Sequence, residues 1–385
     1  MRWFMEVWNA ATELKAGGAD IRAVTAWGLL GAVDWRSLLR RRDGAYDPGA
    51  FDVRAPAPRR TAIGRVAAAL AASGTFAHPV LDRPGWWRRH ERFYHPPEWP
   101  AVGSAPRCRP ILIACGGTLG EDFARICAHR GLDHALLRPH ELDGADPASI
   151  ALALDRLRPW AVIDVGGDRD VEHRLSPRFL AGAARRAVVL SRACAKRGLP
   201  LLAVSSHRVF GGGLGRPLVE GDPVSPVCAS GRVEAEAEAR VAQEHPGALI
   251  VRTGPLFGFS GGRDCAVRTL QSLASGRPAA SEPGVVSPTY VPDFVHAALD
   301  LLLDEESGIW HLANTGATSW RGFEERLAEA AGLGRPRLRE VDAGPITALA
   351  SERHGLMPTL DCAVRRFVQE IGEAWRPETR LEAAE

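Results

Sequence analysis

A glycine-rich turn is the clearest chemical feature of this sequence. The segment PILIACGGTLG has the pattern of an apolar strand, a tight turn and a helix, with the spacing Ala114-x-x-Gly117-x-x-Gly120 and with Gly116 and Leu119 in the same turn. A glycine at Gly117 lets the backbone approach a pyrophosphate, and one at Gly120 lets the helix pack closely on the strand. The helix N-terminus offers N–H groups to phosphate. The pattern predicts a dinucleotide-binding turn; the alternative is a turn without a ligand.

A basic residue ends the next predicted strand. Arg138 stands where a side chain of a dinucleotide-binding fold meets the adenosine ribose. An arginine at this place favours a 2′-phosphate, and therefore NADP, whereas an exposed arginine without a ligand is the alternative. The predicted cofactor is NADP or NAD.

These residues need an α/β fold to position them. From residue 108 onward, apolar runs alternate with helical patterns, which is typical of parallel βαβ units. We expect strands at 110–114, 135–138, 161–165, 201–205 and 249–253, and helices at about 120–130, 147–157, 177–197 and 232–244. The prediction is a Rossmann-type doubly wound parallel sheet in residues 108–345, followed by a C-terminal helical extension at 346–385.

The first 107 residues have a different pattern. We expect a helix at 5–15, a buried strand at 21–30 and a helix at 61–72. Residues 74–107 are rich in Pro, Trp and Arg and lack any period, so they are interpreted as a linker.

Composition argues against several classes of protein. The 385 residues are 45% hydrophobic and 24% charged, which is typical of a soluble globular chain, and the net charge of +2 gives no argument for nucleic acid. The chain has no apolar run of about 18 or more residues, so no transmembrane helix is expected. The seven cysteines form no CxxC pair, so neither a metal site nor a disulfide framework is predicted, and the cytoplasm is the expected location. A small-molecule ligand is expected, and homo-oligomerisation stays open.

Five phrases of the chain resemble one known family. They are LDGADPASIALALDRLRPWAVID, SSHRVFGG, VRTGPLFG, SPTYVPDFVHAALDLL and GIWHLANTGATSWRGF. Similar segments follow one another in the same order in dTDP-4-dehydrorhamnose reductases, which are extended short-chain dehydrogenases/reductases. The resemblance implies a Rossmann domain with a smaller C-terminal substrate domain. It also implies that the ligands are NAD(P)H and a dTDP-sugar, and that the reaction is reduction of the sugar's 4-keto group.

The resemblance assigns roles to individual residues. Asp143 matches an acidic residue near the adenosine, and Ser206 matches the Ser/Thr whose hydroxyl polarises the substrate carbonyl. The implied substrate-binding residues are Arg252, Thr289 and Tyr290.

The family's proton-donating pair is replaced. In the family motif YGRSK, Tyr donates the proton, while Lys lowers the pKa of that Tyr and holds the ribose. The stretch SPVCASGRVEAEAE puts Ser230 at the Tyr position and Glu234 at the Lys position. The only lysines, Lys15 and Lys196, have no Tyr four positions before them, so the chain contains no YxxxK. General-acid catalysis accelerates such a reaction roughly 10²–10⁴-fold. Because the pair is replaced, we expect catalysis to be impaired. His207 is an alternative acid, although a loop histidine without chemistry is the favoured interpretation.

The first 73 residues resemble the C-terminal end of a family 1 glycoside hydrolase barrel. Trp27, Asp34 and Trp35 match positions near the end of its last strand, where an acidic residue and a Trp contact sugar hydroxyls. The fold implied is a partial β/α-barrel fragment, with Met1 as an internal start or the gene as a truncated fusion. The family's two catalytic carboxylates are absent, so glycosidase activity is not expected.

Three functions are compatible with these residues. The favoured one is an NAD(P)- and sugar-nucleotide-binding protein of the reductase type with impaired catalysis, because the cofactor turn is present and the Tyr–Lys pair is not. The second is an active NAD(P)H-dependent reductase with a different proton donor. The third is a fusion remnant or interaction module without a ligand.

Overall fold

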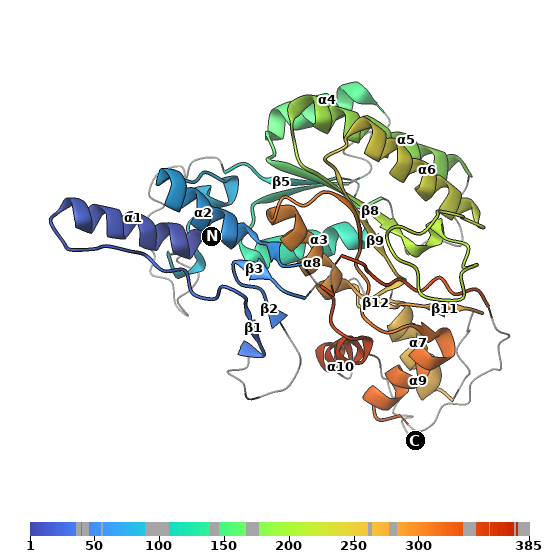
Figure 1. The fold of residues 1–385 in the computed structure, drawn as a ribbon. Helices are drawn as coiled ribbons and strands as arrows, with labels where there is room; N and C mark the ends of the chain where they lie inside the picture. Colours follow the sequence, from blue (N-terminus) through green and yellow to red (C-terminus); the bar gives the residue numbers. More distant parts are fainter. Residues whose placement is uncertain are drawn as a thin grey trace, which may run out of the picture.

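A parallel β-sheet forms the centre of the computed structural model (Figure 1). The structure describes residues 1–35, 40, 46–54, 57–88, 108–114, 116–138, 146–166, 177–260, 264–276, 283–333, 344–353, 355–372 and 375. Within these ranges, the six strands of the sheet follow the spatial order β13 (Gly308–His311), β9 (Leu249–Thr253), β8 (Leu201–Ser206), β7 (Ala161–Asp164), β5 (Ile111–Ala114) and β6 (His134–Leu137). Strands β5, β7 and β9 are buried along their whole length, as expected for a sheet covered on both faces.

The predicted Rossmann-type sheet is confirmed. All five predicted strands are present within about one residue of their expected bounds, and β13 is an additional strand that the sequence analysis did not predict. Strand β5 has β6 on one side and β7 on the other, so successive strands are added to opposite sides of β5. Ligands of open α/β sheets bind at such a switch point, outside the carboxyl ends of the strands.

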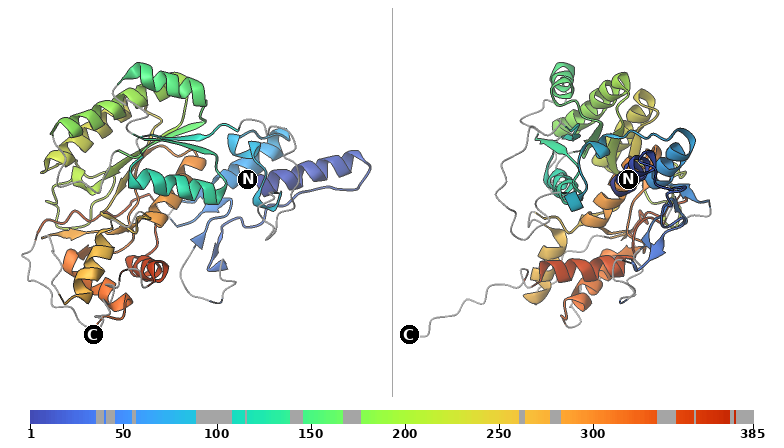
Figure 2. Two further views of the ribbon diagram at one scale, coloured as in Figure 1. Left: turned by 180° about the vertical axis from the view of Figure 1, so that it is seen from behind. Right: turned by 90° about the vertical axis from the view of Figure 1, so that its left-hand side faces the viewer.

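Helices cover both faces of the sheet (Figures 1 and 2). One face carries α3 (Thr118–Arg130) and α8 (Val291–Leu303), and the other carries α4 (Pro147–Leu157), α5 (Pro177–Arg197) and α6 (Ala229–Glu244). Four of these helices were predicted near their observed bounds, and α8 was not. Their hydrophobic periodicity predicts them because each helix presents one apolar face to the sheet.

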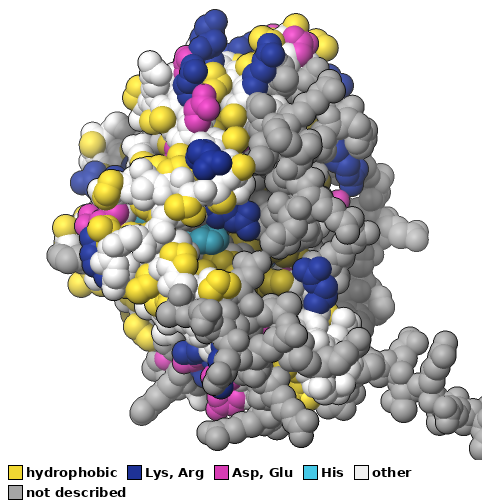
Figure 3. Space-filling model, turned by 90° about the vertical axis from the view of Figure 1, so that its right-hand side faces the viewer, with side chains coloured by type: hydrophobic (Ala, Val, Ile, Leu, Met, Phe, Trp, Pro, Cys, Tyr) yellow, Lys and Arg dark blue, Asp and Glu magenta, His cyan; other side chains and the backbone are white. Residues whose placement is uncertain are grey.

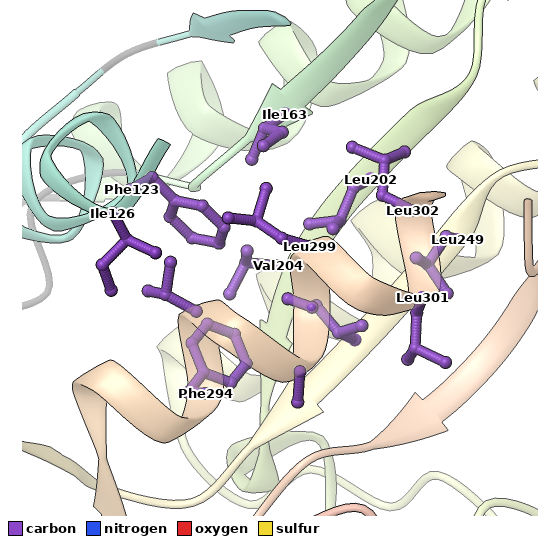
Figure 4. Packing of buried hydrophobic residues seen from close by; sticks show 14 of the residues in the cluster. Phe123, Ile126, Ile163, Leu202, Val204, Leu249, Phe294, Leu299, Leu301 and Leu302 are labelled. Carbon is purple, nitrogen blue, oxygen red and sulfur yellow. The ribbon is translucent and has the colours of Figure 1, made fainter. Parts of the chain in front are cut away.

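The core beneath α3 and α8 is a continuous apolar layer (Figure 4). Phe123 of α3 and Phe294 of α8 meet edge to face, with ring centroids 6.2 Å apart. Both are fully buried, as is Leu202 of β8. Burying one such side chain contributes roughly 1.5–3 kcal/mol, so this layer holds the two helices firmly on the sheet.

A smaller lobe lies beside the carboxyl ends of the strands (Figure 1). Its elements are β10 (Leu256–Phe257), α7 (Cys265–Ala274), β11 (Val285–Val286), β12 (Thr289–Tyr290), β14 (Thr318–Ser319), α9 (Trp320–Ala330) and α10 (Leu360–Ile371). Phe257, Phe323 and Phe367 join three of these elements in one buried cluster. Helix α10 therefore packs into this lobe rather than standing apart as an extension.

The N-terminal segment differs from the expectation. It contains α1 (Arg2–Ala16), β1 (Ala32–Val33), β2 (Tyr46–Asp47), β3 (Phe51–Asp52), β4 (Arg59–Arg60), α2 (Ala62–Ser73) and the short 3₁₀ helices η2 (Pro79–Asp82) and η3 (Trp86–Arg88). The two predicted helices are confirmed. The strand predicted at 21–30 is wrong: the Gly28 and Leu29 carbonyls accept from the Ala50 and Phe51 amides, but these described residues form no strand, and Trp27 is 88% exposed. The described strands are antiparallel pairs of two residues, so the barrel fragment finds no support.

Polar contacts attach the N-terminal segment to the Rossmann domain. The Ala62 amide donates to the Asp304 carboxylate over 2.6 Å, just beyond the C-terminal end of α8. Arg65 donates to the Leu303 carbonyl over 2.8 Å, and Arg2 donates to the Gly131 carbonyl after α3 over 2.8 Å. Two helix C-termini on the same face of the sheet thus hold the segment. In the part of the chain that the structure describes, no helix combines the length and apolarity of a membrane span.

Candidate functional site

The predicted glycine turn joins β5 to α3 at the switch point of the sheet. Gly117 is the N-cap residue of α3, with φ −92° and ψ −152°, so the positive end of the helix dipole lies at the turn. A Cβ at Gly120 would lie 3.3 Å from Leu136 and 3.7 Å from Ile113. A Cβ at Gly116 would lie 2.2 Å from the Leu136 side chain. A side chain at either position would crowd the Leu136 side chain, and glycines in such a strand–turn–helix unit fit a dinucleotide phosphate site.

Arg138, which the sequence analysis placed near an adenosine ribose, lies beside this turn. Arg138 follows β6 directly, and its Nη2 lies 3.6 Å from Oε1 of Glu121 in the first turn of α3. Both side chains are about half exposed. Asp143, which the resemblance placed near the adenosine, lies outside the described residues.

Ser206 and Glu234 lie in contact beyond the carboxyl end of β8. Ser206 is the last residue of β8 and is 3% exposed. Its hydroxyl donates a hydrogen bond to Oε2 of Glu234 on α6, and it accepts one from the Arg208 amide over 3.2 Å. The structure thus brings together the residue at the family's Ser/Thr position and the one at its Lys position.

A close approach of two backbone segments makes this contact possible. Helix α6 begins beside the short helix η6 (His207–Val209), and a Cβ at Gly231 would lie only 2.0 Å from the Arg208 carbonyl oxygen. Cys228 caps α6, because its sulfur accepts from the Gly231 amide over 3.3 Å. Gly231 therefore allows the first turns of α6, including Glu234, to reach the end of β8.

Ser230 lies in the same cluster with a cation beside it. The Arg208 Nη1 donates to the Ser230 hydroxyl over 3.4 Å, and the Cys228 sulfur lies 3.3 Å from that hydroxyl. His207, the alternative acid, follows Ser206 directly on η6 and is half-buried. Its proposed role stays a prediction. Figure 3 shows the right-hand side of the molecule of Figure 1, where basic side chains and histidine lie among hydrophobic ones.

Comparison with known proteins places most of the chain in one family. A sequence model named RmlD substrate binding domain matches residues 110–361. The chain belongs to this family. It is 31% identical to a dTDP-4-dehydrorhamnose reductase of Mycobacterium tuberculosis over 245 residues, 61% of this chain and 79% of that protein. It is 28% identical to another of Streptomyces griseus over 261 residues, 66% of this chain and 84% of that protein.

Solved structures support the fold of this RmlD-family chain. A dTDP-4-dehydrorhamnose reductase of Bacillus anthracis in complex with NADP superposes with a TM-score of 0.58 at 21% identity, covering 68% of this chain and 98% of that one. One from Clostridium acetobutylicum has a TM-score of 0.58 at 19% identity, covering 68% and 99%. The family match begins at residue 110, so it gives no support to the expected glycoside hydrolase fragment in residues 1–73.

All three predicted substrate residues have internal partners. Arg252 is 1% exposed, and its guanidinium pairs with Glu238 at 2.6 Å. The hydroxyl of the buried Thr289 donates to a backbone carbonyl two residues earlier. Tyr290 donates to Glu370 on α10; burial first, and then this bond, raise the pKa of Tyr290. Their contact with substrate stays a prediction that this placement does not support.

A cavity of about 1730 Å³ lies elsewhere in this RmlD-family chain. The outer face of α8, helix α10 and the N-terminal segment form its walls, and Tyr290 and Trp86 are among its lining residues. Neither Ser206 nor Glu234 lines it. The cavity is therefore distinct from the cluster at the carboxyl ends of the strands.

One polar pair near the switch point was not singled out from the sequence. Asp164 ends β7 and is 3% exposed, and its carboxylate accepts from the Gly166 amide over 3.1 Å. The Arg186 Nε lies 3.6 Å from the same carboxylate. An acidic residue at the end of the apolar run AVID was the available signal, because buried charges need partners.

Proposed function

We propose that this RmlD-family chain binds NAD(P), and a dTDP-linked sugar beside it, but reduces the sugar poorly. The observation that carries the proposal is the hydrogen bond from Ser206 to Glu234. In the family's arrangement, the serine hydroxyl polarises a carbonyl and a lysine supplies a positive charge. Here the hydroxyl proton points to a carboxylate, and the charge at the lysine position is negative.

The glycine turn supports the binding half of the proposal. A Cβ at Gly116 or Gly120 would meet the Leu136 side chain, and the N-terminus of α3 begins at the same turn. Bound NAD(P)H would supply a hydride to a carbonyl. This chain would bind the phosphates at Gly117 and the adenosine half beside Arg138. The Ser206 hydroxyl would lie on the other side of the phosphates from Arg138.

The replacement of the proton donor supports the second part of the proposal, that reduction is slow. Reduction of a carbonyl requires a proton for the developing alkoxide, and a Tyr serves when a nearby cation lowers its pKa toward neutrality. Ser230 has a far less acidic hydroxyl than a Tyr. The loss of a general acid costs roughly 10²–10⁴ in rate.

A second candidate function rests on Arg208. Its guanidinium lies 3.4 Å from the Ser230 hydroxyl, which puts a cation beside the group at the Tyr position. In that case the chain would be an active reductase of a dTDP-4-keto-sugar with a serine donor. Substitution Arg208→Gln would then remove turnover without removing cofactor binding.

One experiment separates the candidates. NADPH and NADH are titrated with and without dTDP-4-dehydrorhamnose, while cofactor fluorescence reports binding and nicotinamide absorbance reports oxidation. Saturable binding with little absorbance loss is expected. The double variant Ser230→Tyr/Glu234→Lys should then gain turnover over the unaltered chain. Turnover in the unaltered chain that Ser206→Ala abolishes would contradict impairment, and the lack of any binding would contradict the whole proposal.

A further inference from the structure

The direction in which a dinucleotide would extend follows from the sheet. The phosphate turn lies after β5, and Arg138 marks the adenosine side after β6. A dinucleotide lies across the carboxyl ends of the strands, so its second half extends the other way, over β7 and β8. Neighbouring strands lie about 4.8 Å apart, so the end of β8 is about 10 Å from the phosphate turn. Ser206 and Glu234 lie at that place.

The two oxidation states of the cofactor differ there by one charge. The nicotinamide ring is a cation in NAD(P)⁺ and neutral in NAD(P)H, whereas the pyrophosphate and the adenosine half are the same in both. A fixed protein charge near the second half therefore changes the affinities of the two forms unequally. A charge near the adenosine half changes both equally.

We infer that the Glu234 carboxylate makes this site prefer the oxidised cofactor, NAD(P)⁺, over the reduced one. This inference rests on the proposed function, because it requires that a cofactor binds. The Ser206 hydrogen bond holds the carboxylate at the end of β8. A lysine at the same position would have the opposite effect, so the replacement reverses the sign of the charge rather than merely removing it.

Other charges near the cluster define the test. Arg208 lies against Ser230, one helical turn before Glu234, and its cation opposes the effect of the carboxylate. Asp164 and Arg186 are paired with each other at 3.6 Å and largely offset one another. Glu236 lies on the same helix with its side chain 66% exposed and its carboxylate 3.9 Å from Arg240. Solvent screens such an exposed charge, which makes Glu236 a matched control.

The test is a calorimetric titration of the full chain with NADP⁺ and with NADPH. The measured quantity is the ratio of the two dissociation constants. Glu234→Gln keeps a hydrogen-bond acceptor for Ser206 but removes the charge, and we expect the preference for NADP⁺ to fall roughly tenfold. Glu234→Lys should lower the preference for NADP⁺ further, and Arg208→Gln should raise it. Glu236→Gln should leave it unchanged.

The outcomes are distinguishable from those of the proposed function. If both forms bind and the ratio is the same in the unaltered chain, Glu234→Gln and Arg208→Gln, the inference is wrong while cofactor binding stands. If neither form binds to the folded chain, both the inference and the proposed function are overturned. A ratio that changes equally in Glu234→Gln and Glu236→Gln would also overturn the inference, because the effect would then reflect overall charge.

Discussion

Arg59 in the N-terminal segment and Asp304 just beyond α8 form a buried ion pair across 245 positions of sequence. Each side chain is 8% exposed, and Asp52 and Glu306 also lie within 3.4 Å of the Arg59 guanidinium. The Asp304 carboxylate accepts the Ala62 amide as well, at the start of α2. The segment is therefore joined to the Rossmann domain by a network that is shielded from water.

Breaking this pair should destabilise the whole chain. Asp304→Asn removes the main ionic partner of Arg59, while Asp52 and Glu306 remain beside the guanidinium, and we expect a loss of about 1.5–3 kcal/mol in the free energy of unfolding. Urea denaturation measures it. Asp20→Asn is the matched control, because Asp20 pairs with Arg22 where both side chains are more than three-quarters exposed, and it should cost about 1 kcal/mol or less. Equal small losses in both variants would show that the segment is only loosely attached.

A second buried pair separates structural from ligand-binding roles. Arg252→Met leaves Glu238 buried without its cation, and we expect a loss of about 3–5 kcal/mol in unfolding free energy. The double variant Arg252→Met/Glu238→Leu should lose less than the sum of the single variants. Sugar-nucleotide affinity should not change at temperatures where the variants stay folded. A selective loss of affinity with normal stability would restore Arg252 as a substrate residue.

His311 should make stability depend on pH. It is 3% exposed, its Nδ1 lies 2.8 Å from the Ala350 carbonyl oxygen, and its Nε2 faces Arg252 at 3.4 Å. Burial, together with Arg252, lowers the pKa of His311 in the folded chain. The unfolded chain binds this proton more readily. The contribution of His311 to the free energy of unfolding is therefore complete above about pH 6.5, and it is lost as the pH falls toward the pKa of the folded chain.

The measurement is the free energy of unfolding between about pH 5 and 8. One such proton gives a slope of at most about 1.4 kcal/mol per pH unit below pH 6.5. His311→Gln should flatten that slope. His129→Gln should not, because His129 is exposed. If the two variants give the same curve, His311 is not the group that titrates.

Gly231 should control both stability and ligand affinity. In Gly231→Ala the new methyl group meets the Arg208 carbonyl oxygen, so α6 must move away from η6. We expect a loss of about 1–3 kcal/mol in unfolding free energy and a smaller preference for NADP⁺ over NADPH, because the Glu234 carboxylate then moves away from Ser206. Gly213→Ala is the control, since a Cβ there meets no atom within 4 Å. Unchanged stability in Gly231→Ala would mean that the approach of the two segments is not tight.

Local patterns in the sequence predicted most of the Rossmann domain. Strands β5, β7 and β9 and helices α4 and α5 lie within about one residue of their expected bounds. Their apolar runs and periodic faces are the direct consequence of burial in a covered sheet. The glycine spacing also predicted where β5 turns into α3, because the turn and the close packing at Gly120 depend on residues within one βα unit.

The failure in the N-terminal segment has a physical reason. The run IRAVTAWGLL is as apolar as a buried strand, but a strand also needs a neighbour to pair with, and sequence alone does not supply one. The tertiary structure leaves Trp27 exposed and attaches the segment elsewhere, through charged residues such as Arg59. Hydrophobicity indicated that residues 21–30 would be buried, and the contacts of the folded chain decided otherwise.

By itself, the sequence determined which side chains are available: no YxxxK pair, Ser230 and Glu234 in its place, and the glycines of the cofactor turn. Only the tertiary structure decided what these side chains contact. The bond from Ser206 to Glu234 joins a strand end to a helix 28 positions later, and the Arg252 guanidinium pairs with Glu238. Such contacts depend on how closely distant segments pack, which no local pattern encodes.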